Sequence, residues 1–313
     1  MKRYRIVLLF ILVILLISGC RRIHQGATEL SEIVFMANVD SPSLGTVKPD
    51  GSGLNYIKLN ERFLMPRGSP DGNTLYGLTK TSAAFIGYPA YWDLESGRFG
   101  FCKRGSSYYL QIQGTGDPSN DHEVIIQNLW EIVVLDLNTC EEKIRIVESA
   151  IVENGPIYRY NGFSYDYENR QMAYGRVMEF NEGREYDILI LDIDTGSERR
   201  VATGINPSFS PNRNLIVYID LESQATLLDI EAGTEEILFK VNPIDFWGSN
   251  IPGDLEPIFN WSPDGRYLVY HKCRTDRVSA EYCDIYKYDL LLSEETLVTL
   301  NGVFPDWIQT ENY

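Results

Sequence analysis

Short apolar segments separated by polar turns follow one another from about residue 31 to the end of the chain. Two of them, Ile132–Leu135 and Ile188–Leu191, are continuous apolar runs without alternation. Such runs are typical of strands buried on both faces, as in a sheet that lies between two others. No stretch of useful length after residue 20 has helical spacing. The pattern predicts an all-β protein built from stacked sheets.

One strand–turn–strand motif recurs, and its best copy is Pro257–Tyr270. Ser262-Pro263 holds the chain extended, Asp264 can bond its own backbone, and Gly265 supplies a positive φ. Copies of the turn begin at residues 69, 119, 164, 210 and 262, so consecutive copies are 45 to 52 residues apart. A repeat of this length is typical of the four-stranded blade of a β-propeller.

A second motif, an apolar strand followed by a polar turn and another strand, occurs six times. Its copies are Leu44–Gly51, Tyr91–Gly97, Trp130–Cys140, Tyr186–Gly196, Thr226–Gly233 and Asp284–Glu294. The missing sixth copy of the first motif is divided between the chain ends, because Phe304–Trp307 resembles the strand before the turn and Ile33–Phe35 the strand after it. We therefore predict a six-bladed β-propeller of four-stranded antiparallel blades, closed by strands from both termini.

The start of the chain has the features of an export signal. Lys2, Arg3 and Arg5 precede the apolar run Ile6–Ile17, which is shorter than the roughly 20 residues that span a bilayer. The run ends in Leu16-Ile17-Ser18-Gly19-Cys20, which resembles the lipobox of bacterial lipoproteins. This resemblance implies cleavage before Cys20 and a diacylglycerol on its thiol. An ordinary secretory signal with a chance cysteine is the alternative.

The same resemblance implies a location and a domain division. An Asp after the lipidated cysteine retains Gram-negative lipoproteins at the inner membrane, whereas this chain has Arg21. The outer membrane is therefore expected in a Gram-negative cell, and the outer face of the cell membrane otherwise. We expect residues 1–19 to be the signal peptide, residues 20–30 the lipidated cysteine and tether, and residues 31–313 a single propeller domain.

The formal net charge of the chain is −16. Nucleic acids and anionic lipid surfaces both attract basic faces, so neither is an expected partner. The membrane would be contacted through the lipid anchor only, and a monomer is expected. No cofactor is expected.

Four cysteines remain besides Cys20, and an even number in an exported chain permits two disulfides. Cys273 and Cys283 flank the connection between two predicted strands, so a bridge there is a candidate; Cys102 with Cys140 is the remaining pair. No CxxC spacing occurs, and the chain has three histidines. We therefore expect no metal site.

The motif Trp261-Ser262-Pro263-Asp264-Gly265 and the following Tyr-Leu-Val-Tyr strand resemble the TolB-type, WD-repeat-like β-propeller family over about residues 31–308. The resemblance implies the fold but no single activity, because the family includes binding proteins, peptidase accessory domains and lyases. Related oligogalacturonate lyases bind metal through several histidines, which argues against that activity here. The α/β domain of TolB and the hydrolase domain of prolyl oligopeptidase-type enzymes have no counterpart in the sequence, so neither activity is expected.

Three connections between predicted strands are long and aromatic. Their candidate binding residues are Tyr88, Tyr91, Tyr158, Tyr160, Phe246 and Trp247. Aromatic loops on a rigid scaffold suit a protein, peptide or glycan partner of the cell envelope, although the same rings could instead cover blade ends or plug the channel. We expect a binding protein without catalytic residues that holds such a partner through its aromatic loops or the mouth of its channel. The alternative is a carbohydrate-active or peptide-cleaving enzyme that uses carboxylates facing the channel.

Overall fold

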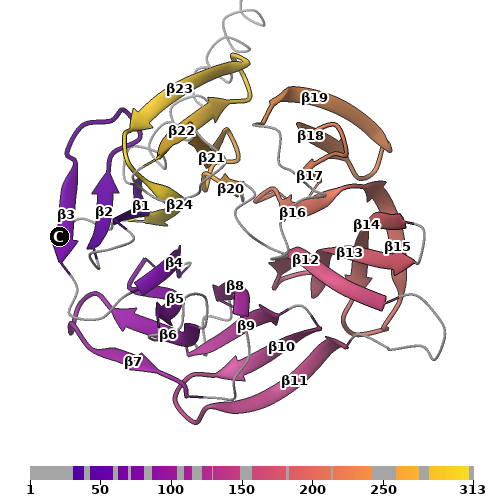
Figure 1. The fold of residues 1–313 in the computed structure, drawn as a ribbon, viewed down its shortest axis with the longest axis horizontal. Coiled ribbons are helices and arrows are strands. Elements are labelled where there is room, and N and C mark those ends of the chain that lie inside the picture. Colours follow the sequence, from indigo (N-terminus) through magenta and orange to yellow (C-terminus); the bar gives the residue numbers. More distant parts are fainter. Residues whose placement is uncertain are drawn as a thin grey trace, which may run out of the picture.

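The computed structural model describes residues 31–38, 43–58, 63–69, 72–80, 87–103, 109–114, 122–128, 130–148, 157–180, 183–212, 214–241, 259–274 and 282–309. Within these residues the chain forms six antiparallel sheets of four strands each, arranged around a central axis (Figure 1). The prediction of a six-bladed β-propeller is therefore confirmed. No helix in the described part of the chain has the length and hydropathy needed to cross a membrane.

The blades are numbered along the chain, and the strands of each are given from the channel outward. Blade 1 comprises β24 (Val303–Gln309), β1 (Ser31–Asn38), β2 (Ser43–Val47) and β3 (Asn55–Lys58). Blade 2 comprises β4 (Phe63–Gly68), β5 (Thr74–Lys80), β6 (Gly87–Asp93) and β7 (Phe99–Phe101). Blade 3 comprises β8 (Tyr109–Gly114), β9 (Glu123–Asn128), β10 (Glu131–Asp136) and β11 (Glu141–Glu148).

The remaining blades follow the same plan. Blade 4 comprises β12 (Ile157–Asp166), β13 (Gln171–Phe180), β14 (Gly183–Asp192) and β15 (Glu198–Thr203). Blade 5 comprises β16 (Ile205–Phe209), β17 (Leu215–Ile219), β18 (Gln224–Asp229) and β19 (Thr234–Lys240). Blade 6 comprises β20 (Asn260–Trp261), β21 (Tyr267–Cys273), β22 (Cys283–Asp289) and β23 (Glu294–Thr299).

Blade 1 closes the ring with strands from the two chain ends. The C-terminal strand β24 pairs antiparallel with β1, so that Gln309 lies opposite Ser31 and Trp307 opposite Ile33. β24 is thereby the innermost strand of a blade whose other three strands come from the start of the chain (Figure 1). This arrangement confirms the predicted closure and leaves no innermost strand unpaired.

The recurring turn has a common hydrogen-bond pattern. In blade 6 the main-chain N–H of Tyr267 donates to the Ser262 hydroxyl, and the N–H of Ser262 donates to the Tyr267 carbonyl. Ser69 and Ser210 make the same two contacts with the residue five positions later in blades 2 and 5. Gly265 has a φ of 70°. The serine therefore closes the turn in these three copies, which gives it a structural role there.

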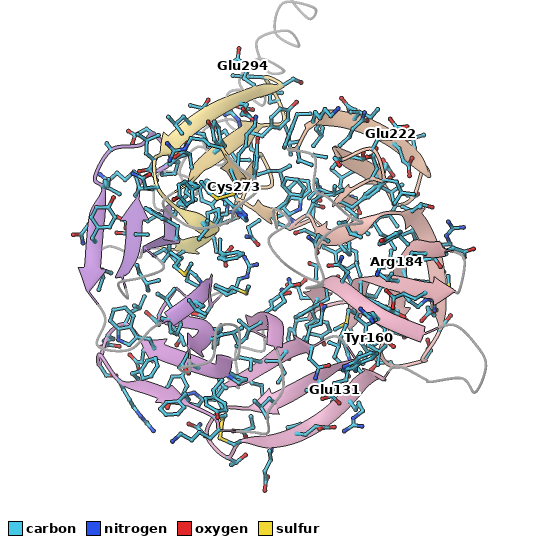
Figure 2. The ribbon with its side chains drawn as sticks, viewed as in Figure 1. Glu131, Tyr160, Arg184, Glu222, Cys273 and Glu294 are labelled. Atoms are coloured by element: carbon cyan, nitrogen blue, oxygen red, sulfur yellow. A yellow bond between two sulfur atoms is a disulfide. The ribbon has the colours of Figure 1, made fainter. Side chains whose placement is uncertain are left out.

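The hydrophobic core is divided among the spaces between neighbouring blades. Side chains point alternately to the two faces of a strand, so Ile188 and Ile190 pack against blade 5 while Leu189 and Leu191 pack against blade 3. All four are buried, as are Ile132–Leu135 of blade 3. The prediction that these continuous apolar runs are strands buried on both faces is confirmed. Charged side chains such as Glu222 and Glu294 lie at the periphery of the ring (Figure 2).

Two disulfides are present in the described residues. Cys102 follows β7 and bonds to Cys140 in the turn after β10, with the two Cα atoms 5.3 Å apart, so this bridge joins blade 2 to blade 3. The Cys102 sulfur lies 3.1 Å from the Leu137 carbonyl oxygen. Cys273 bonds to Cys283, its direct partner in the β21–β22 ladder. Both pairings are the candidates considered from the sequence, and two disulfides indicate an oxidising, extracytoplasmic environment.

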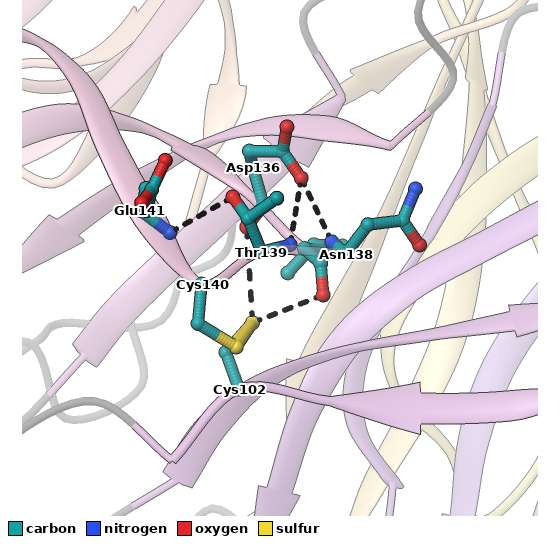
Figure 3. Close-up of a disulfide and its surroundings, with 7 residues drawn as sticks. Cys102, Asp136, Asn138, Thr139, Cys140 and Glu141 are labelled. Atoms are coloured by element: carbon teal, nitrogen blue, oxygen red, sulfur yellow. Dashed lines mark hydrogen bonds between the residues drawn. A yellow bond between two sulfur atoms is a disulfide. The ribbon is translucent and has the colours of Figure 1, made fainter.

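The turn after the third strand of a blade carries an aspartate whose carboxylate accepts main-chain N–H groups. Asp136 accepts from Asn138 and Thr139, as Figure 3 shows. The Thr139 N–H is the main cause that lowers the pKa of Asp136, and the Thr195 N–H acts likewise on the pKa of Asp192. These contacts favour the ionised carboxylate in the folded state.

We expect acid to destabilise the ring through these turns. Because the folded-state pKa lies below the ordinary value of 3.8, the stabilisation is complete above that pH and is lost as the pH falls through the folded-state pKa. Urea unfolding between pH 7 and about pH 3 should show a falling free energy of unfolding below about pH 4. Asp192→Asn should weaken this dependence; an unchanged slope would contradict the assignment.

Candidate functional site

A cavity of about 540 Å³ lies in the channel, and all six innermost strands contribute to its lining. Its lining reaches Pro211 and Pro263 in the turns that follow β16 and β20. The cavity therefore lies toward the end of the ring where Ser69, Ser210 and Ser262 begin their turns, which we call the turn end. Its volume lies within the range of about 300–1,000 Å³ that is usual for small-molecule sites.

Six residues occupy the same position in the six innermost strands, and all six line the cavity. They are Arg67, Gln113, Ser164, Ser208, Asn260 and Asp306, which we call the polar collar. Strand register establishes their equivalence, since each lies opposite a central residue of the second strand: Tyr76, Ile125, Ala173, Val217, Val269 and Val34. The collar places one positive charge, one negative charge and four neutral polar groups at one level of the channel.

A backbone irregularity precedes the collar in four blades. The residues two positions before the collar members, Met65, Gly162, Asn206 and Phe304, have φ between 51° and 74°. The register between the first and second strand shifts at each of these places. Bulges of this kind bend a strand and redirect the side chains that follow. Because four blades share the bulge, we regard it as part of the architecture of the channel wall.

Most collar residues bond the next blade along the chain. The side chains of Gln113 and Asn260 donate to main-chain carbonyls of blades 4 and 1, at 3.5 and 2.7 Å. The Ser164 hydroxyl accepts from a blade 5 N–H, and Asp306 Oδ2 accepts from the Gly68 N–H at 3.0 Å. Ser208 takes part through its carbonyl, which accepts from the Trp261 indole at 3.1 Å. These contacts hold neighbouring innermost strands together.

Arg67 departs from this pattern. Its side chain is 4% exposed and lines the cavity, yet its Nη1 has no hydrogen-bond partner within the described part of the chain. Burial lowers the pKa of the Arg67 guanidinium, and the Asp306 carboxylate partly offsets this effect. A buried guanidinium nitrogen without a partner is costly, because it loses its water without gaining another acceptor.

Asp306 is the neighbouring charge, from blade 1. Desolvation raises its pKa, while Arg67 and the Gly68 N–H act in the opposite direction. Glycine is required at position 68, because a Cβ there would lie 2.6 Å from the Trp307 carbonyl oxygen. The close approach of β24 and β4 thus brings a carboxylate beside the guanidinium. Perturbed charges that share a cavity are typical of functional sites.

The arrangement can therefore offer a ligand both a cation and an anion. Ser208 also lines the cavity, and a serine hydroxyl can donate or accept a hydrogen bond. Asp166 also lines the cavity, but its carboxylate accepts two hydrogen bonds from Asn169. Among the described residues, no group of three or more His, Cys, Asp or Glu side chains is placed to hold a metal ion.

The structure corrects part of the predicted binding surface. Tyr91 lies within β6 and is 3% exposed, and Tyr160 lies within β12 and is 6% exposed. Both rings pack in the hydrophobic cores between neighbouring blades. Strand positions that face a neighbouring blade take large apolar side chains. Tyr91 and Tyr160 are core residues, so the expectation of exposed binding loops fails at these two positions. Figure 2 shows Tyr160 within its blade.

The other predicted residues have varied positions. Tyr88 is the second residue of β6, where it is half-buried and stacks on Phe101 with ring centroids 6.3 Å apart. Tyr158 lies near the start of β12, opposite Met178. Both lie at the strand ends away from the turn end, and hence away from the cavity. Cys20, Phe246 and Trp247 lie outside the described residues.

The sequence analysis missed Arg67 and Asp306, although the sequence held a signal for them. Each directly precedes the residue aligned with Trp261, and the corresponding residues Ser208 and Asn260 are also polar. Aligning the copies of the motif and comparing this one position would have separated the charged members from the neutral ones. Their proximity depends on ring closure, which places β24 beside β4.

Comparison with known proteins supports the fold. No family model matches the chain, and no curated protein matches it. TolB from Acinetobacter baumannii superposes with a TM-score of 0.64 at 15% identity, covering 90% of this chain and 67% of that one. A chain of a nidogen/laminin complex gives a TM-score of 0.62 at 12% identity, covering 90% of this chain and 100% of that one. At such low identity these likenesses establish the β-propeller fold alone.

Proposed function

We propose that this protein is a non-catalytic, lipid-anchored, extracytoplasmic β-propeller that binds an envelope protein, a peptide or a glycan at the turn end of its channel. One observation carries the proposal: all six blades contribute to a cavity that contains a buried guanidinium with an unpartnered nitrogen. The main-chain bonds of the collar hold this cavity in shape before any ligand arrives. A preformed site loses little conformational freedom on binding.

The anchor would set the orientation of the ring. Ser31 lies at the turn end, because it pairs with Gln309 beyond the collar residue Asp306. If Cys20 carries the lipid, residues 21–30 span at most about 35 Å between the membrane and Ser31. The turn end and its cavity would then face the membrane. A partner held close to that membrane fits this orientation.

The enzyme alternative depends on Asp166 and Asp306, the two carboxylates among the described residues of the cavity lining. Desolvation raises the pKa of Asp306, as a general acid requires. However, Asp306 already accepts the Gly68 N–H, and Asp166 is occupied by Asn169. Both carboxylates thus have structural hydrogen bonds, which favours binding over catalysis.

Membrane fractionation followed by affinity capture tests the proposal. We expect the wild-type protein in the membrane fraction and Cys20→Ser in the soluble fraction, because the substitution removes the acyl attachment. Capture of the wild type from native membranes should recover one stoichiometric partner or glycan. Membrane retention of Cys20→Ser would contradict the anchor. An empty capture together with turnover of a glycan or peptide panel would support the enzyme alternative.

A further inference from the structure

Arg67 differs from most other collar residues, which join their blade to the next one by hydrogen bonds. The corresponding side chains Gln113, Ser164, Asn260 and Asp306 bond the main chain of the next blade. Nη1 of Arg67 is buried and makes no hydrogen bond within the described residues, and Arg67 lines the cavity. The position therefore contributes less to the joining of the blades than its equivalents do, while it carries the cost of a buried charge. A ligand that supplies the missing acceptor would account for it.

The charge of the cavity restricts the ligand. Arg67 is the one cation among the described residues that line it, whereas Asp166 and Asp306 are carboxylates. A phosphate dianion would meet two like charges with only one guanidinium to offset them. A carboxylate carries a single charge and fits the planar N–H pair of one arginine.

The neighbouring groups call for a donor on the same ligand. Asp306 is partly exposed to the cavity, and one of its oxygens is bonded to the Gly68 N–H. An ionised carboxylate has about four acceptor sites, so Asp306 can accept a further N–H or O–H. Ser208 lines the same cavity. A ligand with a carboxylate and a nearby hydroxyl or amino group matches both charges at once.

We propose that the collar binds a small organic carboxylate that carries a hydroxyl or amino group, with its carboxylate on Arg67 and its donor on Asp306. The inference rests on the binding function proposed for the same channel and specifies its ligand chemistry. The cavity of about 540 Å³ holds a ligand between the size of a hydroxy acid and that of a short acidic sugar. Hydroxy acids, amino acids and uronic acids share this chemistry.

Isothermal titration calorimetry on the full mature chain tests the inference. The probes are lactate, alanine and glucuronate, with glucose and inorganic phosphate as controls. We expect at least one of the three carboxylates to bind and both controls to bind at least tenfold more weakly. The strongest of the three identifies the source of the carboxylate. Failure of all three to bind, or tighter binding of phosphate, would overturn the inference.

Substitutions at the collar locate the site. Arg67→Gln should weaken the carboxylate by about 10- to 100-fold, because it removes charge-assisted hydrogen bonds. Arg184→Gln is the matched control on the rim, where Arg184 pairs with Glu179, and should leave affinity unchanged. Arg67→Lys keeps the charge but not the planar fork, and serves if Arg67→Gln fails to fold. It should weaken binding by about tenfold. Unaltered affinity in either Arg67 variant would show that the ligand binds elsewhere.

Calorimetry and membrane capture can fail independently. If a partner is captured but no carboxylate binds, the carboxylate inference is wrong and the proposed function stands. If a carboxylate binds with the expected dependence on Arg67 while capture is empty, the inference stands and the macromolecular partner is wrong. If a partner is captured but no carboxylate binds, Arg67 acts only as the counter-ion of Asp306.

Discussion

A chain that ends at Asn301 is expected to lose cooperative folding. The deletion removes β24, whose buried side chains Val303, Phe304, Trp307 and Ile308 pack against blades 2 and 6. Burial of four such side chains contributes about 6–12 kcal/mol. That is comparable to the entire stability of a typical domain, about 5–15 kcal/mol. Circular dichroism and urea unfolding should show no sharp transition.

A circular permutant provides the control for this deletion. Because Gln309 lies opposite Ser31, a two-residue turn can join them. The new chain starts at Gly302, passes through β24 into β1 and ends at Asn301, so that blade 1 becomes contiguous like the other five. We expect it to unfold cooperatively. A truncated chain that unfolds as sharply as the wild type would show that β24 is dispensable for the ring.

The sequence was sufficient for the fold because its repeats constrain the same structure several times. The Ser262 turn and its copies at Ser69 and Ser210 form matching hydrogen bonds, so the sequence similarity reflects a shared local geometry. The continuous apolar run Ile188–Leu191 predicted a strand buried on both faces, and all four of its side chains are buried. Ring closure followed from counting complete and incomplete copies. Each of these arguments uses the period of the chain and needs no contact between distant residues.

The site was less predictable because aromatic content alone does not show which way a ring points. Tyr91 and Trp92 are adjacent, yet alternation along β6 directs them into different cores, Tyr91 against blade 3 and Trp92 toward blade 1. Arg67 and Asp306 stand at opposite ends of the chain, and only closure of the ring brings them together. Arg67 is a candidate because it is buried and its Nη1 has no partner among the described residues. Neither property can be read from a sequence.

We expect the charged Arg67–Asp306 pair to make the fold less stable than a neutral pair would, and to be retained because it binds the ligand. Replacing Asp306 with Asn keeps an acceptor for the Gly68 N–H but leaves the Arg67 charge uncompensated. We expect a loss of about 2–3 kcal/mol, below the 3–5 kcal/mol typical of a fully buried pair because Asp306 is partly exposed. Arg67→Met should cost a similar amount at neutral pH. Because burial raises the pKa of Asp306, this second loss should shrink as the pH falls toward 3.8.

The double variant Arg67→Met/Asp306→Asn separates a binding role from a structural one. Neutral replacement of both partners of a buried pair is often harmless or stabilising by about 1–4 kcal/mol. We therefore expect the double variant to be at least as stable as the wild type in urea, although each single variant is less stable. If the double variant loses as much free energy of unfolding as the two single variants together, each charge supports the ring independently. Recovery of stability without recovery of carboxylate binding would instead show that the two charges are maintained at this position for the ligand.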